Sequence, residues 1–286
     1  MDSSSHFEDV PLSDLRPVTS FSSDDTLLPA AVVPRRHIET QETIDSGAWN
    51  EAYKNAMGVT IAQMLALAVS PHWELVDSPS GGDETISLFE DVSDPSFVCL
   101  KATGIVAGRA DRFLYILKDH DPETRLAWDG KWFTRVQQLE TYVNPEEGDL
   151  TVVASCLRSP VPMLFSDRSA LGIQWTGYDS LLKTHKLVYT TVNHPIFKHP
   201  EGMARVHLSM LVVLREIDND KKKKKKQTEI TLVVKTGPPP PALSLIDLGG
   251  YKETIREQIH LFERVVANWA HYYGPTRDPK KIENRK

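Results

Sequence analysis

The chain has 286 residues, of which 40% are hydrophobic and 25% are charged, as in an ordinary globular protein. Its formal net charge is −6, and without the six consecutive lysines at 221–226 it would be −12. A general nucleic-acid binder spreads basic charge over a whole face, so this acidic balance argues against nucleic acid as a partner.

The first 45 residues are rich in Ser, Asp, Pro and Thr and show no sustained apolar period. Such a segment buries too little surface to offset the entropy lost on ordering. We therefore expect a disordered tail over 1–45, a folded domain over 46–276 and a flexible tail over 277–286. The start of the chain lacks the features of a signal peptide, and no apolar run is long enough to span a bilayer. We expect a cytoplasmic protein.

The folded part begins with a helical pattern. Apolar residues recur at three- and four-residue steps from Trp49 to Ala68, and Ser70-Pro71 ends the run. Three strand-like segments follow, "WELVDS", "TISLFED" and "FVCLKATGIV", separated by Gly, Pro, Ser and Asp. The pattern predicts one long amphipathic helix and then a three-stranded antiparallel meander.

A helical interval over 109–133 comes next, and strands resume with "QQLETYV", "LTVVASCL", "ALGIQWTG" and "KLVYTTVNH". Two longer strands, 204–217 and 229–236, alternate in polarity. Cys99 and Cys156 lie in strand-like segments with no Cys or His at zinc-ligand spacing. We expect two free core thiols and neither a metal nor a cofactor.

The lysine run lies between the two longer strands, in the connection 218–228. This position favours a hairpin loop in water, while a nuclear address and contact with an anionic membrane surface stay open as alternatives. The membrane-contact candidates are Lys221, Lys222, Lys223, Lys224, Lys225 and Lys226.

The chain closes with a proline-rich lead-in, "GPPPPALSLIDLGG", and an amphipathic helix over 251–274. One face of this helix is apolar and includes Ile255, Ile259, Phe262, Val266 and Trp269. The elements together predict an α+β fold in which a curved antiparallel sheet of about nine strands wraps around a long C-terminal helix. Side chains either fill the interior of such a sheet or leave it open for a ligand.

Several stretches, taken in order, resemble the START domain, the helix-grip lipid-binding family. They are "RLAWD" (125–129), "PVPMLFSDRSALGIQW" (160–175), "VNHPIFKHPEGMARV" (192–206) and the proline-containing entry to the last helix. The resemblance covers about Trp49 to Tyr273. Two departures stand out: "SDRSA" lacks the family's aromatic residue, and Ser155 and Gln174 stand where sterol-binding members carry an acidic residue and an arginine.

The resemblance implies a non-enzymatic protein that encloses one lipid in an apolar cavity gated near the C-terminal helix and meets membranes transiently. Phospholipids, sphingolipids and sterols are the implied ligands. Enclosure is physically required because exposing an acyl chain to water costs about 0.8 kcal/mol per CH₂.

The strand 204–217 offers two candidate faces for that cavity. One is mixed in polarity and the other apolar; they are His207, Ser209, Leu211 and Val213 against Val206, Leu208, Met210 and Val212. Arg205 either approaches a lipid headgroup or pairs with a carboxylate. The lid candidates are Ile255, Ile259, Phe262, Val266 and Trp269. For Trp128 and Asp129 a packing and capping role competes with a functional one.

Two other functions remain as alternatives. An interaction or lipid-sensing module would have a filled cavity, and a helix-grip enzyme would need catalytic groups. The sequence contains no Gly-x-Ser-x-Gly, His-Glu-x-x-His or P-loop motif. His194 and His199 lie beside prolines and are typical of turn residues rather than zinc ligands.

Overall fold

The computed structural model describes residues 46–77, 86–91, 93–94, 97–142, 148–158, 166–193, 197–217, 226–237 and 249–274. All of them lie in one unit of the chain, 38–286. The predicted tails, the lead-in 238–248, His194 and the lysines 221–225 lie outside the described residues. No described helix is long and apolar enough to cross a membrane.

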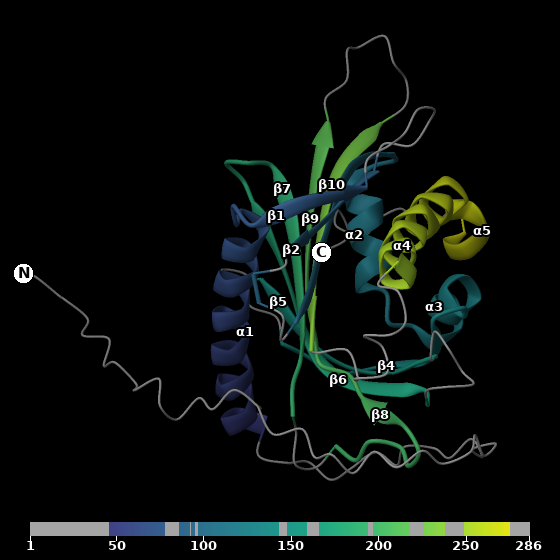
Figure 1. Cartoon of the computed structure of the whole chain (residues 1–286). Helices are drawn as coiled ribbons and strands as arrows, with labels where there is room; N and C mark the ends of the chain where they lie inside the picture. The colour runs from purple at the N-terminus through teal and green to yellow at the C-terminus, as the bar shows by residue number, and fades with distance from the viewer. Residues whose placement is uncertain are drawn as a thin grey trace, which may run out of the picture. The chain divides into compact units, whose positions relative to one another are not determined.

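Ten strands form a single sheet in the described part of the chain (Figure 1). Its order is β1-β2-β3-β10-β9-β7-β6-β5-β4, and these neighbours pair antiparallel. The strands are β1 (Trp73–Asp77), β2 (Ile86–Asp91), β3 (Val98–Ala107), β4 (Phe133–Tyr142), β5 (Asp149–Leu157), β6 (Arg168–Asp179), β7 (Thr184–Thr191), β8 (Ala204–Arg205), β9 (Leu208–Ile217) and β10 (Gln227–Thr236). The expected meander and the expected hairpin of the two longer strands are confirmed.

Helix α1 (Ser46–Ala68) covers one face of the sheet, called here the α1 face (Figure 1). Tyr53, Met57 and Met64 of this helix are buried, and they pack on apolar side chains of the central strands. Those side chains are Leu150, Val152, Ala154, Leu171, Ile173, Val188, Leu211 and Val233. The predicted first helix is confirmed, and its three- and four-residue period reflects this single buried stripe.

The opposite face, called the α4 face, packs against α2 (Ala110–Lys118), α4 (Gly249–Ala267) and α5 (Trp269–Tyr273). In Figure 1 these helices lie across the sheet from α1. The alternate residues of β3, β7, β9 and β10 enter this second core, with Leu100, Leu187, Val212 and Leu232 among its buried members. The sheet is therefore covered by apolar helix faces on both sides, as the helix-grip prediction requires.

The structure corrects the boundaries of three predicted elements. The helical interval consists of two helices, α2 and α3 (Pro122–Asp129). Asp121 caps the start of α3, because its side chain accepts a hydrogen bond from Thr124 N at 3.0 Å, and Pro122 occupies the first turn. Phe133 begins β4 rather than ending a helix. The long strand 204–217 is divided, since Ala204–Arg205 form β8, which pairs parallel with β6.

The predicted C-terminal helix is also interrupted. Asn268 has φ −102° and ψ 32°, and its side-chain amide donates to Arg264 O at 2.9 Å. Asn268 N keeps its helical bond to Arg264 O at 3.0 Å, but His271 N then donates to Asn268 O at 2.9 Å, three residues back instead of four. The axis therefore breaks between α4 and α5.

Candidate functional site

Strand β9 presents its two sets of side chains to different helices. Met210 and Val212 belong to the core beneath α4, whereas Leu211 and Val213 pack toward α1. Ser209 bonds Thr190 at 2.9 Å between the hydroxyl oxygens. Of the two candidate faces left open by the sequence, the apolar one is directed toward the C-terminal helix.

The remaining candidates of this region lie at the start of β9. Arg205 is exposed, and no ion pair joins it to another described residue. The His207 carbonyl accepts from Gly237 N and from Thr236 Oγ1, both at 3.0 Å. His199, the described member of the histidine pair, bonds Ser169 Oγ through Nδ1 at 2.6 Å. No cluster of three potential metal ligands occurs among the described residues.

The proposed lid residues all lie at the interface between the C-terminal helices and the sheet. Each is buried in the core of the α4 face: Ile255, Ile259, Phe262, Val266 and Trp269. Val266 also lies against Gly108 at the end of β3, and Glu263 accepts from Ala107 N at 2.8 Å. The end of α4 is thus tied to the sheet by both apolar and polar contacts.

A second region of the α4 face differs in chemistry. On β5 and β6 the residues that alternate with the α1 core carry short or polar side chains: Thr151, Val153, Ser155, Ala170, Gly172, Gln174 and Thr176. They are buried, yet they belong to neither apolar core. Short side chains reach less far from the sheet than the leucines and valines of β3, β9 and β10.

Tyr189 on β7 extends over this region. Its ring lies where a Cβ atom at Gly172 would be, so only glycine permits this position. Burial raises the pKa of the Tyr189 phenol, and a hydrogen bond with Ser155 acts in the opposite direction. The phenol therefore joins β7 to β5 across β6 as a neutral donor and acceptor.

Gln174 lies between the Tyr189 and Thr151 backbones in the sheet register. Its exposed fraction is 5%, and no hydrogen bond of its side-chain amide to another described residue is present. Thr151, Ser155, Gln174 and Tyr189 are called here the polar patch.

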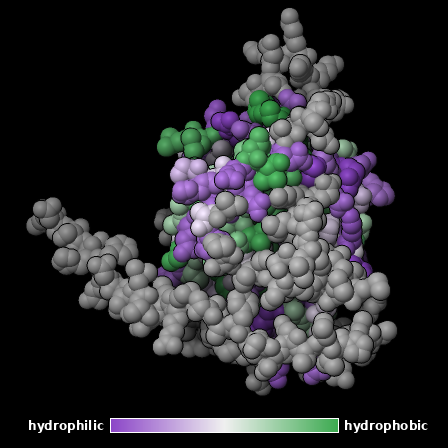
Figure 2. All heavy atoms as spheres, viewed as in Figure 1, coloured by the Kyte–Doolittle hydropathy of each residue, from purple (hydrophilic) through white to green (hydrophobic). Residues whose placement is uncertain are grey.

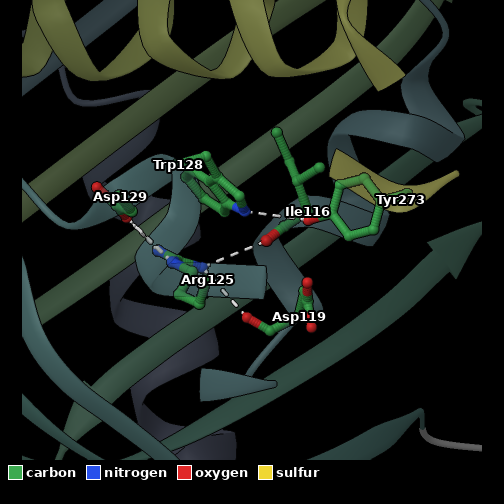
Figure 3. Close-up of polar contacts among 6 residues, drawn as sticks. All are labelled: Ile116, Asp119, Arg125, Trp128, Asp129 and Tyr273. Carbon is green, nitrogen blue, oxygen red and sulfur yellow. Dashed lines mark hydrogen bonds and ion pairs between the residues drawn. The ribbon is translucent and has the colours of Figure 1, made fainter. Parts of the chain in front are cut away.

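A separate polar network joins the helices (Figure 3). Arg125 Nε donates to Asp129 Oδ2 at 3.0 Å, and Arg125 Nη1 donates to the Ile116 carbonyl at 3.3 Å. The guanidinium also covers the Trp128 ring at 4.4 Å from its centroid. Asp129 is fully buried, and burial raises the pKa of its carboxyl group while Arg125 lowers it.

Trp128 extends the network to the end of the chain, because its Nε1 donates to Tyr273 Oη at 3.2 Å (Figure 3). Tyr273 stacks on Trp269 with the ring centroids 4.5 Å apart. Burial and the nearby Asp119 raise the pKa of the Tyr273 phenol. These contacts give Trp128 and Asp129 the packing and pairing role, and they anchor α5 to α3.

Solved structures that include lipid-transfer proteins resemble this chain in fold. No protein-family model and no curated protein matches the chain. The crystal structure of human STARD10 aligns with a TM-score of 0.59 and 13% identity over 87% of this chain and 92% of that one. Human StAR-related lipid transfer protein 5 aligns with a TM-score of 0.58 and 14% identity over 77% of this chain and 98% of that one.

The chain has a START-like fold. The lipid transfer and protein localization domain of human StarD13 (DLC2) also aligns, with a TM-score of 0.50 and 14% identity over 73% of this chain and 95% of that one. The likeness confirms the helix-grip architecture expected from "RLAWD" and the other motifs. In this START-like fold the polar patch and the apolar core of the α4 face lie on the same side of the sheet.

Two members of this arrangement were not predicted. Tyr189 and Gly172 each appeared only as parts of ordinary strands, "KLVYTTVNH" and "ALGIQWTG". A glycine inside a strand signals the close approach of another group, and this was the one indication in the sequence of the Tyr189–Gly172 contact. The partner of that glycine depends on the pairing of β6 with β7, which no single segment encodes.

Proposed function

We propose that this protein binds one lipid between α4 and the α4 face of the sheet and carries it between membranes in the cytoplasm. The observation that carries the proposal is Gln174, whose amide makes no hydrogen bond to another described residue and which shares the α4 face of a START-like fold with an apolar core. Two of the similar structures are named for lipid transfer, which supports the same function here.

The apolar part of the lipid would lie against the aliphatic residues of β9 and β10 and the inner face of α4. Met210 and Val212 are directed there, as are Ile259 and Phe262 from the helix. Each CH₂ removed from water contributes about 0.8 kcal/mol, so an acyl chain or a sterol ring system gains most from this part of the site.

The polar end of the lipid would meet the polar patch. Gln174 offers an amide donor and an amide acceptor, and Tyr189 and Ser155 offer neutral hydroxyl groups. No described residue of the patch carries a charge, and burying a phosphate without a cation is costly. We therefore infer a ligand whose buried polar group is uncharged, such as a hydroxyl, an ester or an amide.

Release of such a ligand requires contact with a membrane and displacement of α4. The run Lys221–Lys226 remains our proposed membrane contact, since each lysine near an anionic surface contributes about 1 kcal/mol. Lys226, its described member, pairs with Glu216 at 2.7 Å. A carrier role needs no catalytic group, and we propose no enzymatic activity.

Native mass spectrometry of the full chain, purified without detergent, tests the proposal. We expect one bound lipid per chain, and Gln174→Leu is expected to lower the bound fraction by about tenfold, because it removes a buried hydrogen bond to the ligand. Thr190→Val is the matched control, since Thr190 lies on the neighbouring strand and faces α1.

Two results would contradict the carrier function. One is a chain that holds no lipid as purified and takes up none from mixed-lipid vesicles, which would favour an interaction module with a filled interior. The other is an equal loss of lipid in Gln174→Leu and Thr190→Val, which would mean that stability, not the polar patch, controls binding.

A further inference from the structure

The turn between β6 and β7 exposes large apolar side chains to solvent. Leu181 is 92% exposed, Leu182 is 62% exposed and Tyr178 is 58% exposed. Figure 2 shows apolar side chains gathered at this end of the molecule, at the upper left of the view. Adjacent exposed leucines at a strand connection are unusual in a monomer and mark a contact surface.

The turn is held in one conformation by its own polar groups. The Asp179 carboxylate accepts from Leu181 N and Leu182 N, both at 3.1 Å, and from Lys186 Nζ at 2.9 Å. Lys183 adopts a left-handed backbone with φ 52°. Because the backbone is fixed in this way, the turn that presents both leucines to solvent loses little conformational entropy on binding.

One exposed lysine lies next to these leucines, while Lys186 pairs with Asp179 and Arg215 pairs with Glu229. Lys183 is exposed and has no ion pair with another described residue. Thr184 pairs with Arg215 in the sheet, so the turn lies beside the end of the β9–β10 hairpin. An apolar tip that carries an exposed lysine suits an anionic lipid surface, where the leucines enter the interface and Lys183 meets a phosphate.

We propose that the β6–β7 turn docks this protein on an anionic membrane, with Leu181 and Leu182 inserted at the headgroup–acyl boundary. The proposal deepens the proposed transfer function and rests on it for its biological purpose. Its physical basis, the exposed pair and the adjacent charge, is separate from the lipid-binding face.

Sedimentation with vesicles tests the docking. The full chain is mixed with phosphatidylcholine vesicles that contain or lack phosphatidylserine. We expect binding only with phosphatidylserine, and about tenfold weaker binding for the double variant Leu181→Asp/Leu182→Asp, because two apolar contacts are replaced by repelled charges. Leu139→Asp is the matched control, an exposed leucine of β4.

The outcomes separate the two proposals. Equal vesicle binding by the double variant and the native chain would overturn the docking surface, as would equal binding to vesicles without phosphatidylserine. Light scattering gives the oligomeric state of both chains. If the native chain is a dimer and the double variant is a monomer, the leucines bind a second copy of this chain, and the membrane-docking proposal is overturned. Lipid retention by native mass spectrometry is expected to be unchanged in the double variant, whereas loss of lipid from the native chain contradicts the carrier function instead.

Discussion

Gly172 is the residue on which the position of Tyr189 depends. A side chain at 172 would overlap the Cζ and Oη atoms of that ring, so the phenol reaches Ser155 only because β6 has no Cβ there. The same contact explains why a strand interior tolerates glycine at an entropic cost.

Gly172→Ala is therefore expected to destabilise the fold by about 1–3 kcal/mol, because the added methyl must displace a partly buried ring. Urea unfolding measures the change. Gly58→Ala is the control: Gly58 lies in α1 with no neighbouring atom in the way, and alanine is expected to stabilise that helix by about 1 kcal/mol. Equal shifts of the two variants would refute the close approach of Tyr189.

Arg125 and Asp129 form a buried pair in which each group depends on the other. Arg125→Met is expected to cost about 3–5 kcal/mol, since it leaves the Asp129 carboxylate buried without its cation. Arg125→Met/Asp129→Leu is expected to recover most of that loss in the same urea experiment. A double variant as unstable as the single one would show that the pair is not the source of the effect.

His120 is buried, and burial together with Arg125 and Lys118 lowers its pKa to about 3. The unfolded chain, with a histidine pKa of about 6.5, then binds more protons than the folded one between these values. The His120 contribution to stability is complete above about pH 6.5 and falls as the pH drops, by about 1.4 kcal/mol per unit.

Comparison of the native chain with His120→Gln isolates this effect. The difference in unfolding free energy is expected to be constant above pH 7 and to shrink toward pH 4. Burial raises the carboxyl pKa values of Asp119 and Asp129, so their contribution to the free energy of unfolding falls as the pH rises. Both residues are present in the native chain and in the variant, so this contribution cancels in the difference. A difference that does not vary with pH would mean that the His120 pKa is the same in the folded and unfolded chains.

At the scale of elements, the sequence predicted what periodicity controls and missed what local hydrogen bonds control. The apolar alternation of β9 identified a strand, yet both of its faces are buried, one by α1 and one by α4. Polarity alone therefore could not assign Leu211 to one side and Val212 to the other. The break at Asn268 was missed for a related reason: the apolar stripe continues through it, and the change lies in the Asn268 backbone angles and in the short bond from His271 N to Asn268 O.

At the scale of the whole molecule, the order of elements and the motifs "RLAWD" and "VNHPIFKHPEGMARV" were sufficient for the START-like fold, because strand and helix periods repeat along the chain. The polar patch was not predictable to the same degree. It depends on which residues of β5, β6 and β7 become neighbours, and the pairing register that brings Gln174 beside Tyr189 is a property of the assembled sheet.

The pairing of β3 with β10 links early and late parts of the chain. Val98 lies opposite Thr236, so on the ribosome β3 is made long before its partner emerges. Until then the first three strands have an open edge, which is a template for pairing with other chains. Messages truncated before β10 would yield a product that aggregates, and complete translation is a condition for a closed sheet centre.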